Sequence, residues 1–207
     1  MSLVEVAVLV SGSGSILRAM LDAGVPVGLV LADRPCRALE IGREAGVAVE
    51  LVDRRAFGGF GPGFDRLAYT ERVTEVLLAH HPDLVAMAGF GTVFDEPVHR
   101  AFPGRILNTH PALLPAFPGW HGVEDALAAG VKVTGCTIHV ASLQMDTGPI
   151  LAQEPVEILP GDTVESLHER IKAVERRLYP ATVLSVLDGL ESGRSPDGLP
   201  RAAEART

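Results

Sequence analysis

The sequence contains little cysteine, and this scarcity excludes two kinds of structure. Of its 207 residues only Cys36 and Cys136 are cysteines, too few and too far apart for a disulfide framework or a Cys-x-x-Cys metal site. The seven histidines contain no His-Glu-x-x-His pattern and no other clustered ligand spacing. We therefore expect no bound metal, and a reducing, cytoplasmic location fits the free thiols.

Basic residues and long apolar runs are also scarce. The 18 lysines and arginines face 26 aspartates and glutamates, which gives a formal net charge of −8 and argues against nucleic acid or a membrane surface as a partner. The first apolar run ends at Val10 without a basic segment before it. It is far shorter than the ~20 residues that a membrane helix needs, and is typical of a buried strand.

Strand-like and helix-like patterns alternate along the chain, which predicts one α/β domain. Strands are expected at residues 4–10, 25–31, 47–52, 83–89, 105–107, 131–140 and 150–158. Helices are expected from residue 16, at 36–45, 65–80, 96–102 and 122–129, and from about residue 161 onward. We predict a Rossmann-like fold with an open, mostly parallel sheet and helices on both faces. Pro180 should kink or interrupt the last helix.

A glycine-serine loop, Ser11-Gly-Ser-Gly-Ser15, separates the first predicted strand from the first helix. Its free backbone N–H groups and the positive end of the helix dipole would suit a phosphate. The loop matches neither the dinucleotide pattern nor the nucleoside-triphosphate pattern, so a single phosphate is favoured. A plain tight turn is the alternative.

Asn108 and His110 begin a proline-rich loop at the end of a predicted strand. Pro111, Pro115 and Pro118 restrict the backbone there, and two residues spaced by two in an extended stretch point to the same side. An amide donor beside an imidazole suits a reaction in which a carbonyl oxygen becomes an oxyanion. Turn chemistry and a surface histidine are the alternatives.

Taken together, these motifs resemble those of the glycinamide ribonucleotide formyltransferases, folate-dependent members of the formyltransferase family that act in purine synthesis. The resemblance runs from Val4 to about Gly189. Its most specific part is Asn-x-His-Pro-Ala-Leu-Leu-Pro-x-Phe-Pro-Gly at residues 108–119, similar to the pattern of enzymes that use 10-formyltetrahydrofolate. The other matching motifs follow in the same order: Ser11-Gly-Ser-Gly-Ser15, Ala88-Gly-Phe90, Asp146-Thr-Gly-Pro149 and Glu175-Arg-Arg-Leu-Tyr-Pro180.

The resemblance implies that Asn108, His110 and Asp146 are the catalytic residues. The ribonucleotide's amine would attack the formyl carbon directly, without a covalent enzyme intermediate. Asn108 and protonated His110 would hold the developing oxyanion, while Asp146 supports the imidazolium and helps to move protons through water. A carboxylate beside a histidine does favour the charged imidazole.

The resemblance also implies the binding residues for glycinamide ribonucleotide and for 10-formyltetrahydrofolate, the co-substrate. Those for the ribonucleotide are Gly14, Ser15, Ile16, Lys172, Ala173, Val174 and Glu175. Those for the folate are Arg66, Gly91, Thr92, Val93, Phe94, Asn108, Ser142, Leu143, Gln144, Met145 and Asp146. Gly14 to Ile16 would hold the phosphate, Glu175 the ribose and Arg66 the cofactor's carboxylate tail. Without the resemblance, Glu175 would be interpreted as a solvated charge.

Two positions depart from the family pattern. Ile16 stands where asparagine is usual, so one side-chain contact expected from the family pattern is in doubt here. Gly91-Thr-Val-Phe94 replaces a more typical Met-Arg-Ile-Leu, which bears on the shape of the pterin pocket. His121 and His139 match histidines of the family, and we assign them structural support only. As a buried strand residue, His139 fits a backbone-satisfied role as well as a functional one.

Three other readings remain open. A formyltetrahydrofolate deformylase and a methionyl-tRNA formyltransferase resemble the same proline loop, but we expect the first to carry a regulatory domain before the first strand and the second to carry a further basic domain. A non-enzymatic nucleotide-binding module is the third reading. We expect a formyltransferase domain at residues 1–189 and a polar tail at 190–207. The resemblance leaves a homodimer open.

Overall fold

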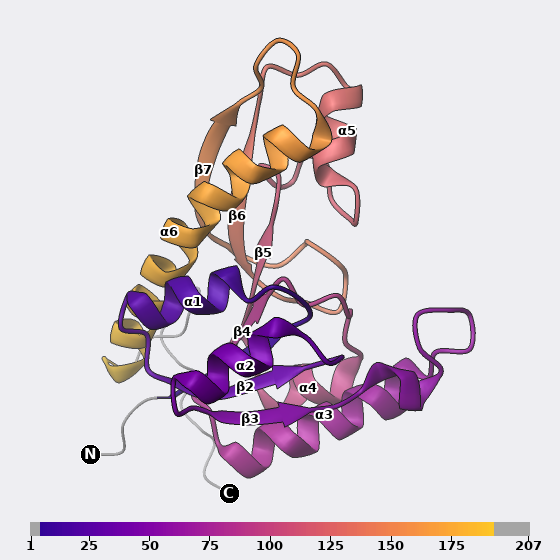
Figure 1. Ribbon diagram of the computed structural model, residues 1–207, viewed down its shortest axis with the longest axis vertical. Coiled ribbons are helices and arrows are strands. Elements are labelled where there is room, and N and C mark those ends of the chain that lie inside the picture. The colour runs from indigo at the N-terminus through magenta and orange to yellow at the C-terminus, as the bar shows by residue number, and fades with distance from the viewer. Residues whose placement is uncertain (1–4, 193–207) are drawn as a thin grey trace, which may run out of the picture.

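A seven-stranded sheet organises the computed structural model, which describes residues 5–192 (Figure 1). Its strand order is β3-β2-β1-β4-β5-β6-β7. The first five strands along the chain are parallel, while β6 runs antiparallel to both β5 and β7. The strands are β1 (Val6–Val10), β2 (Val27–Ala32), β3 (Ala48–Leu51), β4 (Leu84–Ala88), β5 (Ile106–His110), β6 (Val133–Val140) and β7 (Ile150–Glu157).

Helices cover both faces of the sheet, as the alternation in the sequence predicts. They are α1 (Ser15–Asp22), α2 (Arg37–Glu44), α3 (Arg66–His80), α4 (Glu96–Ala101), α5 (Gly122–Ala128) and α6 (Val164–Glu191), with a 3-10 turn, η1, at Arg54–Phe57. In β1, Val6, Val8 and Val10 pack into one core with α1, α2 and α6, whereas Ala7 and Leu9 pack into a second core with α3 and α4. Because both faces are buried, every residue of this strand is apolar.

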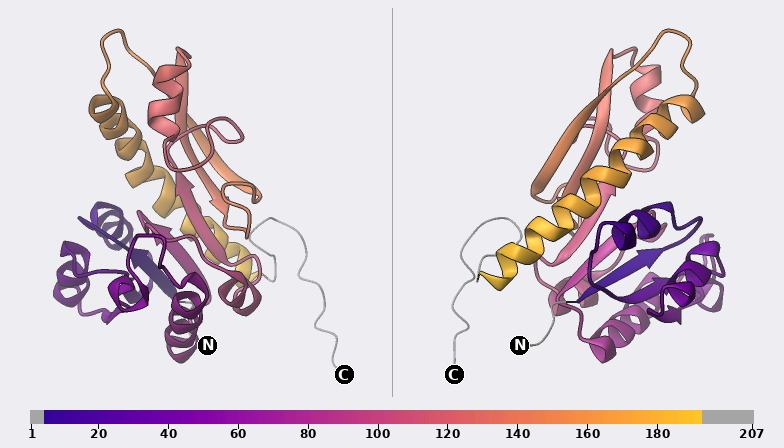
Figure 2. Two further views of the ribbon diagram at one scale, coloured as in Figure 1. Left: turned by 90° about the vertical axis from the view of Figure 1, so that its right-hand side faces the viewer. Right: turned by 60° about the vertical axis from the view of Figure 1, so that its left-hand side comes forward.

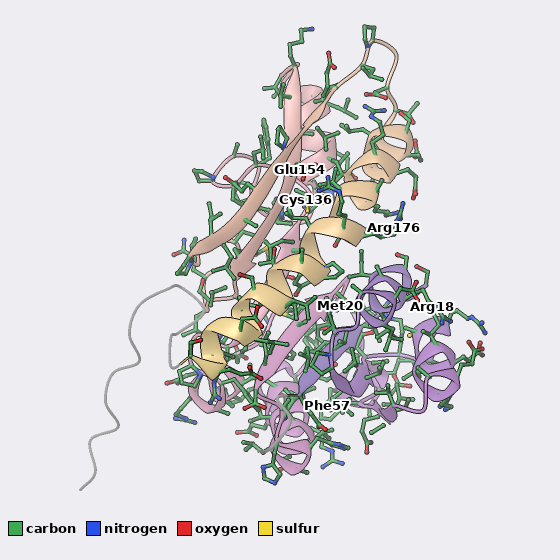
Figure 3. All side chains as sticks on the ribbon, turned by 90° about the vertical axis from the view of Figure 1, so that its left-hand side faces the viewer. Arg18, Met20, Phe57, Cys136, Glu154 and Arg176 are labelled. Carbon is green, nitrogen blue, oxygen red and sulfur yellow. The ribbon has the colours of Figure 1, made fainter. Side chains whose placement is uncertain are left out.

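The long helix α6 lies across one face of the sheet, beside α1 and over β6 and β7 (Figure 2). Met20 of α1 and Cys136 of β6 lie on the same covered side (Figure 3). The expected interruption at Pro180 is wrong, since α6 continues through it to Glu191. Proline removes one helical hydrogen bond, but burial of Tyr179 and Val183 beside it stabilises the helix through tertiary packing.

Strand β5 is longer than the sequence suggested. The proline-rich loop was expected to begin at Asn108, but Asn108, Thr109 and His110 all belong to the strand. They pair with His139, Ile138 and Thr137 of the antiparallel neighbour. This pairing could not be predicted locally, because it depends on a strand that lies about thirty residues further along the chain.

The tail predicted at residues 190–207 falls mostly outside the described residues, which end at 192. None of the helices within residues 5–192 combines the length and apolar character needed to cross a membrane. The loops that follow β1, β4 and β5 gather at the carboxyl edge of the sheet, where open α/β sheets bind ligands. β6 pairs with β5 in the antiparallel direction, so that Thr137 and His139 lie opposite His110 and Asn108 near this same edge.

Candidate functional site

Three polar side chains from two adjacent strands meet a carboxylate from the following loop. Asn108 and His110 lie on β5 with one residue between them, and His139 is paired with Asn108 across the β5–β6 ladder. Asp146 lies in the loop after β6, where its φ of 59° is left-handed, a conformation that aspartate tolerates better than most residues. The strand pairing and this turn together bring the four side chains into one cluster.

The carboxylate of Asp146 lies between two imidazoles. Its Oδ2 is 3.4 Å from His110 Nδ1, and its Oδ1 is 3.6 Å from His139 Nε2. The side chains of His110 and Asp146 are each only 4% exposed, so water screens their interaction weakly. The arrangement can therefore stabilise positive charge on the His110 ring during a reaction.

His139 orients the neighbouring Asn108. Its Nδ1–H donates to the carbonyl of Val140 at 3.1 Å, while burial lowers the pKa of the ring below its usual value. The neutral ring then presents Nε2 as an acceptor, 3.4 Å from the Asn108 amide nitrogen. His139 thus has a backbone hydrogen-bond partner and also contacts Asn108 and Asp146, two of the predicted catalytic residues. A structural role and a functional role for this residue are therefore compatible.

The proline-rich loop covers the histidine–carboxylate pair. His110 Nε2 donates to the carbonyl of Phe117 at 2.7 Å, and the Gly119 N–H donates to Asp146 Oδ2 at 2.8 Å. Gly122 at the start of α5 also lies close, since a Cβ there would be 2.9 Å from His110 Nε2. Any larger residue at position 122 would push the His110 ring aside.

A buried hydroxyl of β6 anchors this loop to the sheet. Thr137 Oγ1 donates to the carbonyl of Ala112 at 2.6 Å and accepts from the Leu114 N–H at 3.1 Å. Gln153 of β7 donates to both the Leu114 carbonyl and the Thr137 hydroxyl. The shape of the loop therefore depends on two strands as well as on its prolines.

A first cavity opens at the cluster of Asn108, His110, His139 and Asp146 and is lined by many of the residues predicted for the folate. Of these, Thr92, Val93, Phe94, Asn108, Ser142, Met145 and Asp146 line it. Arg66, Gly91 and Leu143 line a further pocket that shares Val93, Trp120 and Met145 with the first. Gln144 lines neither pocket. The cavity wall also contains Phe90 and Trp120, so its lining suits a flat, partly apolar ligand.

A second cavity lies on the other side of β5, between the glycine-serine loop and α6. Gly14, Ser15, Ile16, Lys172 and Glu175 line it, as predicted for the ribonucleotide. Ala173 and Val174 do not; Ala173 is exposed and Val174 packs against the hydrophobic core. The two cavities share Gly89, Thr109 and Pro111, so they meet beside Asn108 and His110.

The second cavity provides groups for a phosphate and for hydroxyls. Gly14 precedes α1 with a φ of 75°, and no side chain caps the first N–H groups of this helix, which leaves them for an anion. Lys172 adds a positive charge to the wall. Burial raises the pKa of Glu175, against the effect of the neighbouring Thr109 hydroxyl. A carboxyl group kept out of water in this way is well placed to bind polar ligand groups.

Sequence reasoning missed two residues of the cleft. Trp120 lines both the first cavity and the further pocket, although it is 62% exposed. It is the only tryptophan of the chain and directly follows the proline motif, a signal that could have found it. Arg54 lines the further pocket together with Arg66, but nothing in its local sequence distinguishes it from the adjacent Arg55.

The comparisons with known proteins concern the family and the fold of the chain. A sequence profile described as formyl transferase matches residues 4–183. The chain belongs to the formyl transferase family. The resemblance inferred from the motifs is thereby confirmed at the level of the family, and so is the predicted fold.

Relatives and solved structures of the formyl transferase family cover most of the chain. Phosphoribosylglycinamide formyltransferase of Mycobacterium tuberculosis is 51% identical over 187 residues, which are 86% of this chain and 83% of that protein. The crystal structure of glycinamide ribonucleotide transformylase 1 from Symbiobacterium toebii has a TM-score of 0.82 at 42% identity and covers 89% of this chain and 87% of that one. That of phosphoribosylglycinamide formyltransferase from Bacillus halodurans has a TM-score of 0.82 at 39% identity, with coverages of 91% and 97%.

Proposed function

We propose that the chain transfers the formyl group of 10-formyltetrahydrofolate to the amine of glycinamide ribonucleotide, a step of purine biosynthesis. The observation that carries this proposal is the meeting of Asn108, His110 and Asp146 beside the junction of two cavities. Further support comes from relatives and structural neighbours that are named for this activity and that the chain matches over most of their length.

The reaction needs a site that stabilises an oxyanion and redistributes protons. Attack of the amine nitrogen on the formyl carbon turns the carbonyl oxygen into an oxyanion, to which Asn108 and protonated His110 donate hydrogen bonds. Asp146, 3.4 Å from His110 Nδ1, stabilises the imidazolium. When the bond to the folate N10 breaks, N10 takes up one proton and the amine has lost one, so a water relay at Asp146 balances the transfer.

The contacts of His110 set a condition on this mechanism. Its Nδ1 faces Asp146, and its Nε2 donates to the Phe117 carbonyl at 2.7 Å. The ring can therefore donate through Nε2 to an oxyanion only when the Phe117 carbonyl moves away on substrate binding. Asn108 is under no such restriction, because an amide has two N–H groups and His139 accepts only one.

The two substrates would enter from opposite sides of β5. The phosphate of the ribonucleotide would bind at the N-terminus of α1 and at Lys172, which supplies local positive charge in a chain whose formal net charge is −8. Glu175 would accept hydrogen bonds from the ribose. The folate ring would lie against Phe94 and Trp120 in the first cavity, with its carboxylate tail towards Arg66.

A formyl-transfer assay with matched histidine variants tests this proposal. The purified chain, given both substrates, should form formylated ribonucleotide and tetrahydrofolate in equal amounts, and His110→Asn should abolish most of this turnover. His121→Asn is the control, because that side chain is 74% exposed and has no role in the proposed mechanism. Release of formate without the ribonucleotide would favour the deformylase reading, and binding without turnover would favour the nucleotide-binding module.

A further inference from the structure

His168 shares the wall of the second cavity with Lys172 and with the glycine-serine loop. The two side chains are four residues apart on α6, a spacing that places them on the same face of a helix. α6 lies beside α1 (Figure 2), and the cavity is also lined by Gly14, Ser15 and Ile16 at the start of α1. The half-buried ring of His168 therefore borders the space in front of the first N–H groups of α1.

The second cavity offers little positive charge for a phosphate. A phosphate monoester carries a charge of about −1.5 to −2 at pH 7, since its second pKa is near 6. Among the described residues that line the cavity, Lys172 alone carries a permanent positive charge, and it is paired with Glu169 at 2.9 Å. Glu175 on the same wall adds none. The remaining side chain of this lining that can become a cation is that of His168.

The surroundings of His168 favour its neutral form. Burial is the main cause of a lowered pKa, and the positive charge of Lys172 acts in the same direction. Glu169 on α6 and Glu124 on α5 act against these two effects but do not outweigh them. The glycine-serine loop contributes no ionisable side chain to the cavity, and β6 contributes only the neutral thiol of Cys136. A bound dianion would place negative charge next to the ring and favour its protonation.

We propose that His168 binds the phosphate of the ribonucleotide as an imidazolium, so that the chain takes up a proton from solvent together with this substrate. The inference rests on the proposed function, because it needs a phosphate-bearing substrate in the second cavity. The product keeps the phosphate, so the proton returns to solvent when the product leaves. His168 does not line the first cavity, where Asn108 and His110 lie. Its loss should therefore raise the KM for the ribonucleotide and leave kcat and the KM for the folate nearly unchanged.

Binding of the ribonucleotide across a range of pH tests this role. The Kd of glycinamide ribonucleotide is measured calorimetrically between about pH 6 and about pH 8.5, the range in which a histidine titrates, for the wild type, His168→Asn and His121→Asn. His121 is the control, because its exposed ring lies 4.0 Å from Glu124 but does not line the cavity. The titration of the ligand itself is common to all proteins and cancels in the ratio of two Kd values. Thermal unfolding of each variant checks that it is folded.

We expect the Kd of His168→Asn to exceed that of the wild type by about 10-fold near pH 6, the effect of losing a charge-assisted hydrogen bond. Since the phosphate raises the pKa of the ring in the complex, this advantage of the wild type is lost as the pH rises through the raised pKa, and the ratio should fall to about 2-fold near pH 8.5. His121→Asn should match the wild type throughout. His168→Lys, which stays charged over this range, should bind tightly at both ends of it.

Two outcomes would overturn the role of His168 while leaving the proposed function intact. A ratio for His168→Asn that is equally large at every pH would mean that the ring supports the cavity wall by packing and carries no charge. A ratio near one throughout would place the phosphate away from His168. A wild-type protein that binds no ribonucleotide at any pH would instead contradict the proposed function, and the role of His168 with it.

Discussion

Asp146 Oδ2 lies 3.4 Å from His110 Nδ1, and the two side chains belong to different elements, β5 and the loop after β6. The Gly119 N–H donates to the same carboxylate oxygen, so the covering loop and the His110 ring share one acceptor. A change at either residue therefore alters both the charge of the site and the loop above it.

Asp146→Asn and His110→Ala should each lower kcat by at least ~10²-fold, since both remove stabilisation of the same oxyanion. Asparagine is the appropriate replacement for Asp146, because it tolerates the left-handed φ of 59° at this position. Steady-state kinetics of the two variants and of their combination provide the measurement. The double variant should be little worse than either single one, and losses that multiply would assign the two residues to separate steps.

Gly12→Val should raise the KM for the ribonucleotide far more than the KM for the folate. Gly12 lines the second cavity, and a Cβ at this position meets nothing within 4 Å, so the side chain would occupy ligand space without disturbing the fold. Gly14→Val is a poorer test, because its Cβ would lie 2.8 Å from Ile41 and 2.9 Å from Ala38. If Gly12→Val raises the KM for both substrates equally, the phosphate does not bind at this loop.

Glu175→Gln should stabilise the folded protein at pH 7 to 8 while weakening its binding of the ribonucleotide. Burial raises the pKa of Glu175 above its ordinary value of 4.5, so folding favours the protonated carboxyl group. This contribution to the free energy of unfolding is lost as the pH rises through the raised pKa. The Thr109 hydroxyl and the positive charges of Lys172 and Arg176 oppose this shift, but burial outweighs them. Glutamine avoids burying a charge.

The gain for Glu175→Gln should appear as a higher Tm near neutral pH, where about 1 kcal/mol of stability corresponds to roughly 2–4 °C in a domain of this size. It should shrink towards zero near pH 4, where both proteins carry a neutral group at this position. Calorimetric unfolding scans across this pH range give the measurement. A constant difference at all pH values would show that packing, and not ionisation, separates the two proteins.

Two buried threonines of β6 provide a matched pair. Thr137→Val should cost about 1–3 kcal/mol, because it leaves buried polar groups of the proline loop without partners, and it should also lower kcat by displacing His110. Thr134→Val should be neutral or stabilising, since the buried Thr134 hydroxyl has no hydrogen-bond partner among the described residues. Urea unfolding and kinetics of both variants decide the matter; similar losses in the two would show that the loop does not depend on Thr137.

The parts of the fold that follow from local pattern were predictable from the sequence. The uninterrupted apolar run of β1 predicts a strand buried on both faces, and α3 begins and ends close to its expected bounds. The end of β5 and the last helix were exceptions; the helix continues through Pro180 because of contacts with distant strands. Local rules describe the cost of a proline, but they do not include the packing that offsets it.

Those residues of the candidate site that belong to a recognisable sequence motif were predictable. The proline motif identified Asn108 and His110, and the Asp-x-Gly-Pro motif identified Asp146. Arg54 could not be found in this way, because its place in the pocket wall depends on Phe60 and Phe64 folding around it and on a backbone segment some forty residues further along. The position of such a residue can be recognised only in the folded chain.

The second cavity takes one wall from residues 12–16, near the beginning of the described chain, and another from residues 168–175, near its end. A molecule bound there joins α1 to α6 as a cross-link would, and the segment between the two contacts includes the whole catalytic cluster. Its binding free energy therefore adds to the free energy of unfolding of the complete sheet. The chain also cannot form this cavity during synthesis until α6 has left the ribosome, so recognition of the ligand there comes last in folding.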